Sequence, residues 1–338
     1  MIPAQQTLDD IRALIQRLRE PDTAARTAAR AREPQLTKPP GALGRLEQIA
    51  EWLAAWQGRH PPRLKDARML VFAANHGIAR RGVSAYPIDV THQMVLNFER
   101  GGAAINQLCR IGGLDLRVID AGVDAPTEDF SELPAMSAET CAAAIRLGAD
   151  SLTDCDIVCV GEMGIGNTTA AAAICTTLMG GSAADWVGAG TGVAGDALAA
   201  KIAIVEASVA RHRAAMKDGL EALRHVGGKE IAAMCGVILA ARERRIPVIL
   251  DGYVTGAAAC VLHAMRSDAL AHCIAGHVSA EPGHRRLLSQ IGMPPLLDLG
   301  MRLGEGTGAA LALAIIRGAA ACHAGMATFA EAGVSDKD

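Results

Sequence analysis

Aromatic residues and paired cysteines are what this sequence has least of. Only 3% of its 338 residues are aromatic, and its nine cysteines are scattered without any CxxC pair. An odd number of dispersed cysteines argues against a disulfide or zinc framework and favours reduced core thiols. No apolar span of 18 residues is evident, and the acidic N-terminus lacks a hydrophobic segment, so neither a membrane span nor a signal peptide is expected. We therefore expect a cytoplasmic protein.

Charge imbalance is also small. The formal net charge is −3 at pH 7, from 33 basic and 36 acidic residues. This gives no electrostatic reason to expect nucleic acid or an anionic membrane surface as a partner, so a small molecule is the better expectation. Glycine, in contrast, is abundant: the 36 glycines fit many tight turns between strands and helices.

From about residue 67, short apolar runs that end in glycine alternate with helical stretches, which is the pattern of a parallel sheet. The fold class that we predict is α/β, with a doubly wound, mostly parallel six-stranded sheet flanked by helices. A barrel would need eight strands. The strands are expected at 68–74, 115–120, 156–160, 246–250, 270–275 and 296–299. The helices are expected at 90–110, 167–179, 195–216, 228–243, 253–265, 283–291 and 306–324.

Two amphipathic helices are predicted before this pattern begins, at 7–20 and 42–56. The charged run at 26–33 between them is typical of a solvated helix or a linker. The first helix is expected to lie apart from the main core.

Polar residues and glycines directly follow the predicted strands. Ligands of parallel α/β sheets bind beyond the carboxyl ends of the strands, so these residues are candidates for a site. They are Asn75, His76, Asp120, Gly122, Glu162, Asp251, Gly252, His277, Ser279, Gly304, Glu305 and Gly306.

The strand at 156–160 leads through a glycine-rich turn into an alanine-rich helix, a junction that can bind anions through backbone N–H groups. The spacing Gly161-x4-Gly166 nearly matches a Walker A loop. However, Asn167 stands where a lysine would reach the β- and γ-phosphates, which argues against a nucleoside triphosphatase. A phosphate-loop NTPase and a plain turn without a ligand both remain open as alternatives.

Glu305 lies between two glycines directly before an apolar helix. It could cap a helix N-terminus or act as a general base in an apolar pocket. Burial would raise its pKa and the helix dipole would lower it, so the sequence does not give the sign. Glu162 could face it across the same crevice. Two such carboxylates suit displacement at an anomeric carbon, where positive charge develops on the sugar.

A second glycine loop, at 188–192, opens the helix that carries Lys201. Backbone N–H groups and a lysine would suit a phosphate monoester, although a plain turn with a solvated lysine fits equally well. The segment 76–93, with Tyr86, could form a slot for a flat heterocycle or be an ordinary loop.

Histidines near the fifth strand raise the question of a metal. His277 and His284, with Glu281 between them, have a spacing that matches no common zinc pattern. We therefore expect no metal site and no cofactor.

Taken together, these motifs resemble those of one family, the nicotinate-nucleotide:dimethylbenzimidazole phosphoribosyltransferases. The resemblance runs from about residue 35 to 325, and GEMGIGNTT followed by LGEGTG is its most specific part. The matching motifs are TKPPGALGRLE at 37–47, HGI and GVSAYP within 76–87, QMVLNFERGGAAIN at 93–106, GEMGIGNTT at 161–169, GAGTG at 188–192, GKE at 228–230, LDGYVTGAAA at 250–259, GHVSAEPGH at 276–284 and LGEGTGAA at 303–310.

The resemblance implies transfer of the 5-phosphoribosyl group of nicotinate mononucleotide to 5,6-dimethylbenzimidazole, with inversion at C1′. It implies that Glu305 is the general base and that Glu162 supports the reacting ribosyl group. The substrate-binding residues that it implies are Ser84, Tyr86 and Gln93 for the benzimidazole, Gly164, Gly190 and Lys201 for the phosphate, Ser279 near the nucleotide, and the adjacent Met163, Ile165, Leu303 and Gly304.

The resemblance also implies a Rossmann-like catalytic domain, a smaller helical domain built from the chain ends, and a homodimer. On this basis we expect an N-terminal helical arm at 1–60, a catalytic domain at 61–325 and a C-terminal tail at 326–338. A non-catalytic protein that binds a nucleotide or a corrinoid precursor remains the alternative to an enzyme.

Overall fold

The computed structural model describes residues 7–335, and a parallel sheet forms the centre of this part of the chain. Its five strands lie in the order β2-β1-β3-β4-β5, and every neighbouring pair is parallel. The α/β class and the parallel sheet are therefore confirmed, whereas the predicted number of six strands is wrong. The strands are β1 (Ala67–Ala74), β2 (Asp115–Gly122), β3 (Ile157–Met163), β4 (Val248–Leu250) and β5 (Cys273–Ala275).

The strand expected at 296–299 is reduced to an isolated parallel bridge between Leu297 and His277. Leu297 still donates its N–H to the carbonyl of Gly276, at 3.0 Å. Pro294 and Pro295 precede this segment, and proline has no N–H with which to extend a ladder. The segment therefore follows the edge of the sheet without becoming a sixth strand.

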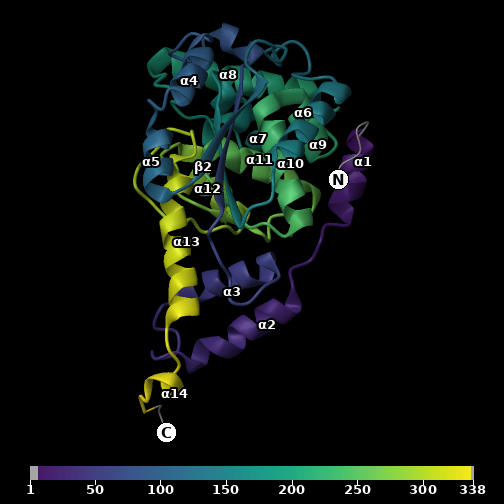
Figure 1. Ribbon diagram of the computed structural model, residues 1–338. Helices are drawn as coiled ribbons and strands as arrows, with labels where there is room; N and C mark the ends of the chain where they lie inside the picture. The colour runs from purple at the N-terminus through teal and green to yellow at the C-terminus, as the bar shows by residue number, and fades with distance from the viewer. Residues whose placement is uncertain (1–6, 336–338) are drawn as a thin grey trace.

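Helices cover both faces of the sheet (Figure 1). Successive side chains of a strand point to opposite faces, so Phe72 packs in one core cluster and Val71 in the other. This two-sided burial explains why the strands are continuous apolar runs. One layer contains α6 (Ala138–Ser151), α7 (Asn167–Met179), α8 (Gly195–His212), α9 (Gly219–Val226), α10 (Lys229–Arg244), α11 (Tyr253–Met265) and α12 (Pro282–Gln290), and the other contains α4 (Val90–Glu99), α5 (Ala104–Gly112) and α13 (Thr307–Gly325). α3 (Arg45–Gln57) lies below the sheet in Figure 1 and adds Ile49 and Leu53 to the second core cluster.

The single helix expected at 90–110 is divided into α4 and α5. Gly101 and Gly102 separate the two, and Gly101 has a φ of +76°, which is a left-handed conformation that ends a helix. The break matters for the site because it creates a second helix N-terminus, that of α5, close to the sheet. α6 and α9 lie in stretches for which no helix was predicted.

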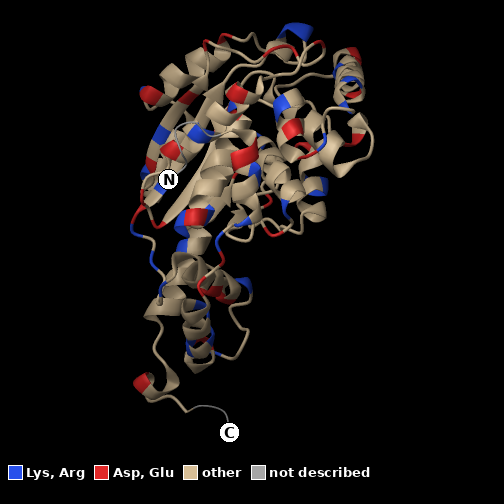
Figure 2. Ribbon diagram, turned by 90° about the vertical axis from the view of Figure 1, so that its right-hand side faces the viewer, with Lys and Arg blue, Asp and Glu red and all other residues tan. Residues whose placement is uncertain are grey.

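A smaller helical part lies below the sheet in Figures 1 and 2. It contains α2 (Thr23–Arg32), α3, the end of α13 and α14 (Phe329–Ala332). Residues 32–36 and 323–328, which are far apart in the sequence, meet here, because Leu36 forms an antiparallel bridge with Thr328 and the Arg32 guanidinium donates to the carbonyls of His323 and Met326. The boundaries 1–60, 61–325 and 326–338 stay a proposal, since α13 belongs to both parts.

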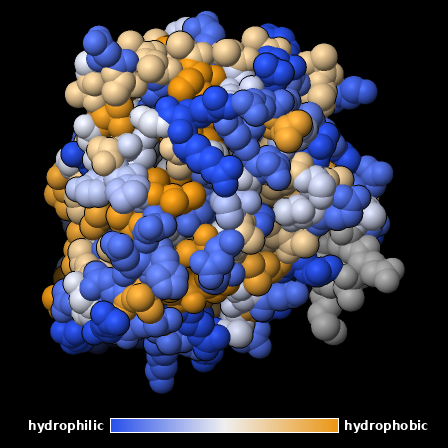
Figure 3. Space-filling model, turned by 90° about the horizontal axis from the view of Figure 1, so that it is seen from above, coloured by the Kyte–Doolittle hydropathy of each residue, from blue (hydrophilic) through white to orange (hydrophobic). Residues whose placement is uncertain are grey.

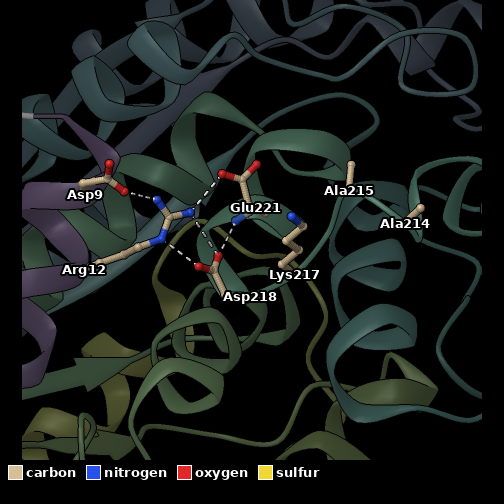
Figure 4. Close-up of a pocket in the computed structure, with 7 residues that line it drawn as sticks. All are labelled: Asp9, Arg12, Ala214, Ala215, Lys217, Asp218 and Glu221. Atoms are coloured by element: carbon tan, nitrogen blue, oxygen red, sulfur yellow. Dashed lines mark hydrogen bonds and ion pairs between the residues drawn. The ribbon is translucent and has the colours of Figure 1, made fainter.

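The first helix, α1 (Leu8–Gln16), does not lie apart from the main core, and that expectation is wrong. Ile11 and Ile15 are fully buried in the larger core cluster. Arg12 holds the helix in place through Asp218 and Glu221, at 2.7 and 2.9 Å, on the wall of a surface hollow shown in Figure 4. The amphipathic face of α1 is therefore explained by packing on α6 and α11.

One helix of the described residues, α13, is long and apolar enough to cross a membrane by length and composition. The statement that no apolar stretch of 18 residues is present is therefore wrong for this helix, but length and composition alone do not make it a membrane span. Half of it is buried within the protein, and Leu313 and Ile316 pack in the core cluster beside the sheet. Its composition is that of a helix that packs on a sheet through alanine and glycine.

Candidate active site

A cavity of about 630 Å³ opens at the carboxyl ends of the strands. The turns that lead into α7 and α13 and the loop after β5 form its walls. This is the edge where ligands bind in open parallel sheets. Most of the site residues predicted from the sequence line the cavity: Tyr86, Glu162, Met163, Gly164, Ile165, Gly190, Ser279, Leu303 and Gly304.

The turn from β3 into α7 approaches its neighbours so closely that only glycine fits. A Cβ atom on Gly164 would lie 2.5 Å from the carbonyl oxygen of Ala74. A Cβ atom on Gly161 would lie 2.5 Å from the backbone nitrogen of Gly306. The glycines of this motif thus bring β3 against both β1 and the start of α13.

Glu162 is a buried carboxyl group on the cavity wall. The side-chain amide of Asn167 donates a hydrogen bond to its Oε2 atom. Burial raises the pKa of Glu162 well above its ordinary value, and the nearby carboxylates of Glu230 and Asp251 raise it further. Asn167, which occupies the position of a Walker lysine, is therefore engaged with a carboxyl group and not with a phosphate.

Glu305 caps a helix, but not the one that it precedes. Its Oε1 atom accepts a hydrogen bond from the backbone N–H of Ile105, at 2.9 Å, at the N-terminus of α5. Glu305 is only 2% exposed, and it is not among the residues that line the cavity, although its neighbours Gly304 and Ala104 are. Burial raises its pKa, the N–H groups of Ile105 and Ala104 lower it, and the Asp251 carboxylate raises it, with a net upward shift. The sequence did not show whether the pKa of Glu305 is raised or lowered, and the structure shows that it is raised, because burial outweighs the effect of the helix N-terminus.

Asp251 supplies the cap that α13 lacks. Its carboxylate accepts hydrogen bonds from the backbone N–H groups of Gly306 and Ala309, at 3.2 and 2.9 Å. The residue before this helix, Gly306, has no side chain that could do so. Asp251 thus joins the end of β4 to the turn that carries Glu305, and it brings a third carboxylate next to Glu162 and Glu305.

Lys201 lies next to the glycine loop at 188–192, behind Thr168 and Gly190 of the cavity wall, and is not itself among the residues that line the cavity. Its ammonium group donates to the hydroxyl of Thr168 at 2.9 Å and to the carbonyl of Gly188 at 3.1 Å. Because the side chain is only 1% exposed, the alternative of a solvated lysine is wrong. Burial lowers the pKa of Lys201 to about 8, and the Glu281 carboxylate opposes this shift.

Glu281 and Arg302 hold the glycine loop on its two sides. The Glu281 carboxylate accepts the backbone N–H of Gly190 at 2.9 Å, and the Arg302 guanidinium donates to the carbonyl of Gly190 at 2.7 Å. The glycine loop is therefore fixed next to Lys201 by two charged side chains, the Glu281 carboxylate and the Arg302 guanidinium.

The segment around Tyr86 forms the outer wall of the cavity. The hydroxyl groups of Ser84 and Thr191 share a hydrogen bond at 2.9 Å, and the backbone N–H of Ala85 donates to Thr191 at 3.0 Å. Ser84 therefore fixes the wall from behind, whereas Tyr86 lines the cavity itself, with the apolar side chain of Leu108 as another lining group. Gln93 is exposed on α4 and does not line the cavity.

Other lining residues had no predicted role in binding. They are Asn167, Thr168, Thr191, Tyr253, His277, Glu281, Met301, Arg302 and Thr307, among others. His277 belongs to the polar set at the strand ends, which was the available signal, and Glu281 was considered only as a metal ligand. No group of three or more His, Cys, Asp or Glu residues that could hold a metal ion occurs within residues 7–335.

The two ends of the cavity differ in charge. At one end, the buried amine of Lys201 and the glycine loop suit an anion such as a phosphate monoester, which would have to displace the Glu281 carboxylate from the N–H of Gly190. Buried carboxyl groups with raised pKa values make the other end suitable for accepting a proton and for positive charge on a bound group. Tyr86 and Leu108 provide an apolar wall for a flat ring.

The sequence and the fold both have close counterparts. A family profile described as Phosphoribosyltransferase matches residues 18–334. The nicotinate-nucleotide–dimethylbenzimidazole phosphoribosyltransferase of Rhizobium meliloti (strain 1021) is 58% identical over 331 residues, covering 98% of each chain. The enzyme of the same name from Methylocella silvestris is 56% identical over 338 residues, covering 100% of this chain and 99% of its own. The crystal structure of CobT from Thermus thermophilus is 42% identical, with a TM-score of 0.87, over 93% of this chain and 100% of that one.

The lowered pKa of Lys201 predicts how anion binding depends on pH. Lys201 is charged below its pKa of about 8 and loses its charge as the pH rises through that value. Sulfate, which does not titrate in this range, should bind with constant affinity below about pH 7.5 and up to about tenfold more weakly for each pH unit above about 8. Isothermal titration calorimetry measures this dependence.

Two variants give this experiment its controls. Lys201→Met should bind sulfate weakly at every pH, whereas Lys217→Met, at an exposed lysine elsewhere on the surface, should behave like the wild type. An unchanged pH dependence in Lys201→Met would show that another group holds the anion.

Proposed function

The chain belongs to the nicotinate-nucleotide–dimethylbenzimidazole phosphoribosyltransferase family, and we propose that it carries out this family's reaction in the cavity between Lys201 and Glu305. The 5-phosphoribosyl group of nicotinate mononucleotide is transferred to 5,6-dimethylbenzimidazole with inversion at C1′. The products are α-ribazole 5′-phosphate and nicotinate, for the lower ligand of cobalamin. The observation that supports this proposal is a cavity with Glu162 on its wall, Lys201 behind its glycine loop and Glu305 behind Gly304.

The layout of the cavity orients the nucleotide. Its phosphate lies against the glycine loop, Lys201 and Ser279, and its ribosyl group lies across the wall that contains Glu162. The benzimidazole lies beside Tyr86, Leu108 and the start of α5. In this arrangement the benzimidazole and the nicotinate approach C1′ from opposite sides, as inversion requires.

Glu305 acts as the general base in this reaction. One benzimidazole nitrogen attacks C1′ while the bond between C1′ and the pyridine nitrogen of the nucleotide breaks. The electron pair of that bond stays on the pyridine nitrogen, which loses its positive charge as nicotinate leaves. The proton on the other benzimidazole nitrogen passes to Glu305. A carboxylate whose pKa is raised holds that proton more strongly than an ordinary carboxylate does, and so is the better base.

Glu162 supports the reacting sugar. Its carboxyl group is held by Asn167 and lies on the cavity wall near the turn that carries Glu305. Positive charge develops on the ribosyl ring as the pyridine leaves, and electron-rich oxygen atoms at this position stabilise it. The same contact argues against a phosphate-loop NTPase, because Asn167, at the position of the Walker lysine, donates its amide to Glu162 and not to a phosphate.

We extend the proposal to a homodimer. Tyr86 and Leu303 are exposed apolar side chains on the cavity wall, and Ile111, which is 85% exposed, lies three residues after the lining residue Leu108 on α5. From above, hydrophobic side chains concentrate in the left half of the surface, the side of α4 and α5 in Figure 1 (Figure 3). A second copy that covers this face would also shield the benzimidazole from water.

A cytoplasmic location also belongs to the proposal and is supported by the nine free cysteines.

Incubation with both substrates tests the function directly. The protein, given nicotinate mononucleotide and 5,6-dimethylbenzimidazole, should form α-ribazole 5′-phosphate and nicotinate in equal amounts, measured by chromatography and mass spectrometry. Binding of the nucleotide without product would instead indicate a non-catalytic binding protein. Magnesium-dependent ATP hydrolysis without ribazole formation would indicate an NTPase.

Substitution of the base gives the sharpest test of its role. Glu305→Gln keeps an oxygen that can accept the Ile105 N–H, so α5 should remain capped and the protein folded. Turnover should fall by about 10²-fold or more, which is the range that a general base supplies. Steady-state kinetics at saturating substrates measures this, and Glu331→Gln, near the C-terminus, serves as the control that should turn over normally. Turnover within about twofold of wild type in Glu305→Gln would exclude the assigned role.

The dimer is tested through Ile111. Wild-type protein should have twice the mass of the chain in size-exclusion chromatography with light scattering, and Ile111→Glu should shift it toward the monomer, because a charge is costly in a buried interface. Leu299→Glu, another exposed apolar residue, is the matched control. A wild-type monomer at all concentrations would contradict the proposal.

A further inference from the structure

His277 is a buried side chain on the cavity wall, and its ring nitrogens make no hydrogen bond to the described part of the chain. It follows β5, and it is only 1% exposed. Within residues 7–335, neither of its ring nitrogens, Nδ1 nor Nε2, has a hydrogen-bond partner. Buried polar atoms of native proteins are nearly always hydrogen-bonded, since an unpaired one costs about 1–3 kcal/mol. Because His277 lines the cavity, a polar ligand that moves in against its ring would supply the missing bond.

The polar neighbours of His277 are occupied elsewhere. Asp251 is nearest, with its Oδ1 atom 3.7 Å from Nε2, which is too far for a good hydrogen bond. The Asp251 oxygens already accept the N–H groups at the start of α13. His284 accepts the N–H of Ser279 at 2.8 Å, and its ring centroid lies 6.3 Å from that of His277. The hydrogen bonds within the described part of the protein therefore do not include the ring nitrogens of His277.

The surrounding backbone makes room for this ring. A Cβ atom on Gly308 would lie 2.0 Å from Cδ2 of His277, and a Cβ atom on Gly252 would lie 3.4 Å from Nε2. Gly308 belongs to the first turn of α13, and Gly252 directly precedes α11. A glycine at each of these places lets the imidazole lie between the two helix starts, at the side of the cavity.

The charges near His277 indicate which part of the nucleotide it meets. Asp251 lies next to the ring, and Glu162 and Glu281 line the same cavity. These acidic groups disfavour the nicotinate carboxylate at this position. A neutral hydroxyl group, which can both donate and accept, suits a histidine among carboxylates. In the orientation above, the sugar lies between the phosphate end and the benzimidazole, which is the region His277 borders.

We propose that His277 binds a hydroxyl group of the ribosyl ring of nicotinate mononucleotide and so positions C1′ between the leaving nicotinate and the benzimidazole. This assignment rests on the proposed function for the identity of the nucleotide. The bond satisfies a ring nitrogen that the free protein leaves unpaired, and it ties the sugar to the segment that follows β5.

Deoxy analogues of the substrate test this contact. The dissociation constant and kcat/KM are measured for nicotinate mononucleotide and its 2′-deoxy and 3′-deoxy forms, in wild type and in His277→Ala. Wild type should discriminate against one analogue by about tenfold or more in kcat/KM, since the ring then loses its partner. In His277→Ala that discrimination should fall to about one, while kcat/KM for the full substrate falls by about tenfold or more.

Two more variants distinguish a contact with the sugar from a purely structural role of the histidine. His277→Asn, which retains a polar group, serves if the alanine variant does not fold, and it should show the same loss of discrimination. His263→Ala, at a half-buried histidine on α11 outside the cavity, should discriminate as wild type does. The proposal is overturned if both His277 variants keep the wild-type discrimination, or if they lose only the preference for nicotinate mononucleotide over nicotinamide mononucleotide.

The same measurements distinguish a failure of the proposed function from a failure of the proposed role of His277. If wild type forms no α-ribazole 5′-phosphate, the proposed function fails, and the dissociation constants from calorimetry still report whether His277 recognises a ribosyl hydroxyl. If wild type forms the product with equal kcat/KM for all three nucleotides, the function stands and the role of His277 is wrong.

Discussion

Burial of several carboxyl groups at the junction of β3, β4 and α13 is the constraint on which the site depends. Carboxylates close together inside a protein repel one another and lose hydration, which is costly unless donors replace the water. Here each has its own donor: Asn167 for Glu162, the N-terminus of α5 for Glu305, and the N-terminus of α13 for Asp251. Burial still dominates, so all three pKa values are raised.

These hydrogen bonds also determine the arrangement of the surrounding elements. Asp251 ties β4 to α13, and Glu305 ties the turn before α13 to α5. The backbone must come close for this, as shown by Gly304, where a Cβ atom would lie 2.5 Å from the Oε1 atom of Glu162. The glycine motifs are therefore needed as much for packing around the carboxyl groups as for contact with a phosphate. Behind them, His76 and Glu230 form a fully buried pair at 2.7 Å that supports the β3 turn.

The sequence predicted the parallel sheet and most of the cavity wall, because buried strands are continuous apolar runs and ligands bind where those runs end. It did not predict contacts between distant segments. Nothing near Glu305 indicates that it caps a helix 200 residues earlier in the chain, and nothing near His277 indicates that it is buried without a partner. The missing sixth strand depends on Pro294 and Pro295, and the position of α1 depends on Ile11 and Ile15 meeting a core formed elsewhere. Gln93 lies in a matching motif but on an exposed helix face.

The dependence of kcat on pH tests the central claim, that Glu305 is a base whose pKa burial has raised. A base acts in its deprotonated form, so kcat at saturating substrates should rise with pH through an apparent pKa above the ordinary carboxyl value of 4.5. This rise should be absent from Glu305→Gln, measured from about pH 5 to about pH 9. An identical rise in both proteins would contradict the account, because the titrating group would then lie elsewhere.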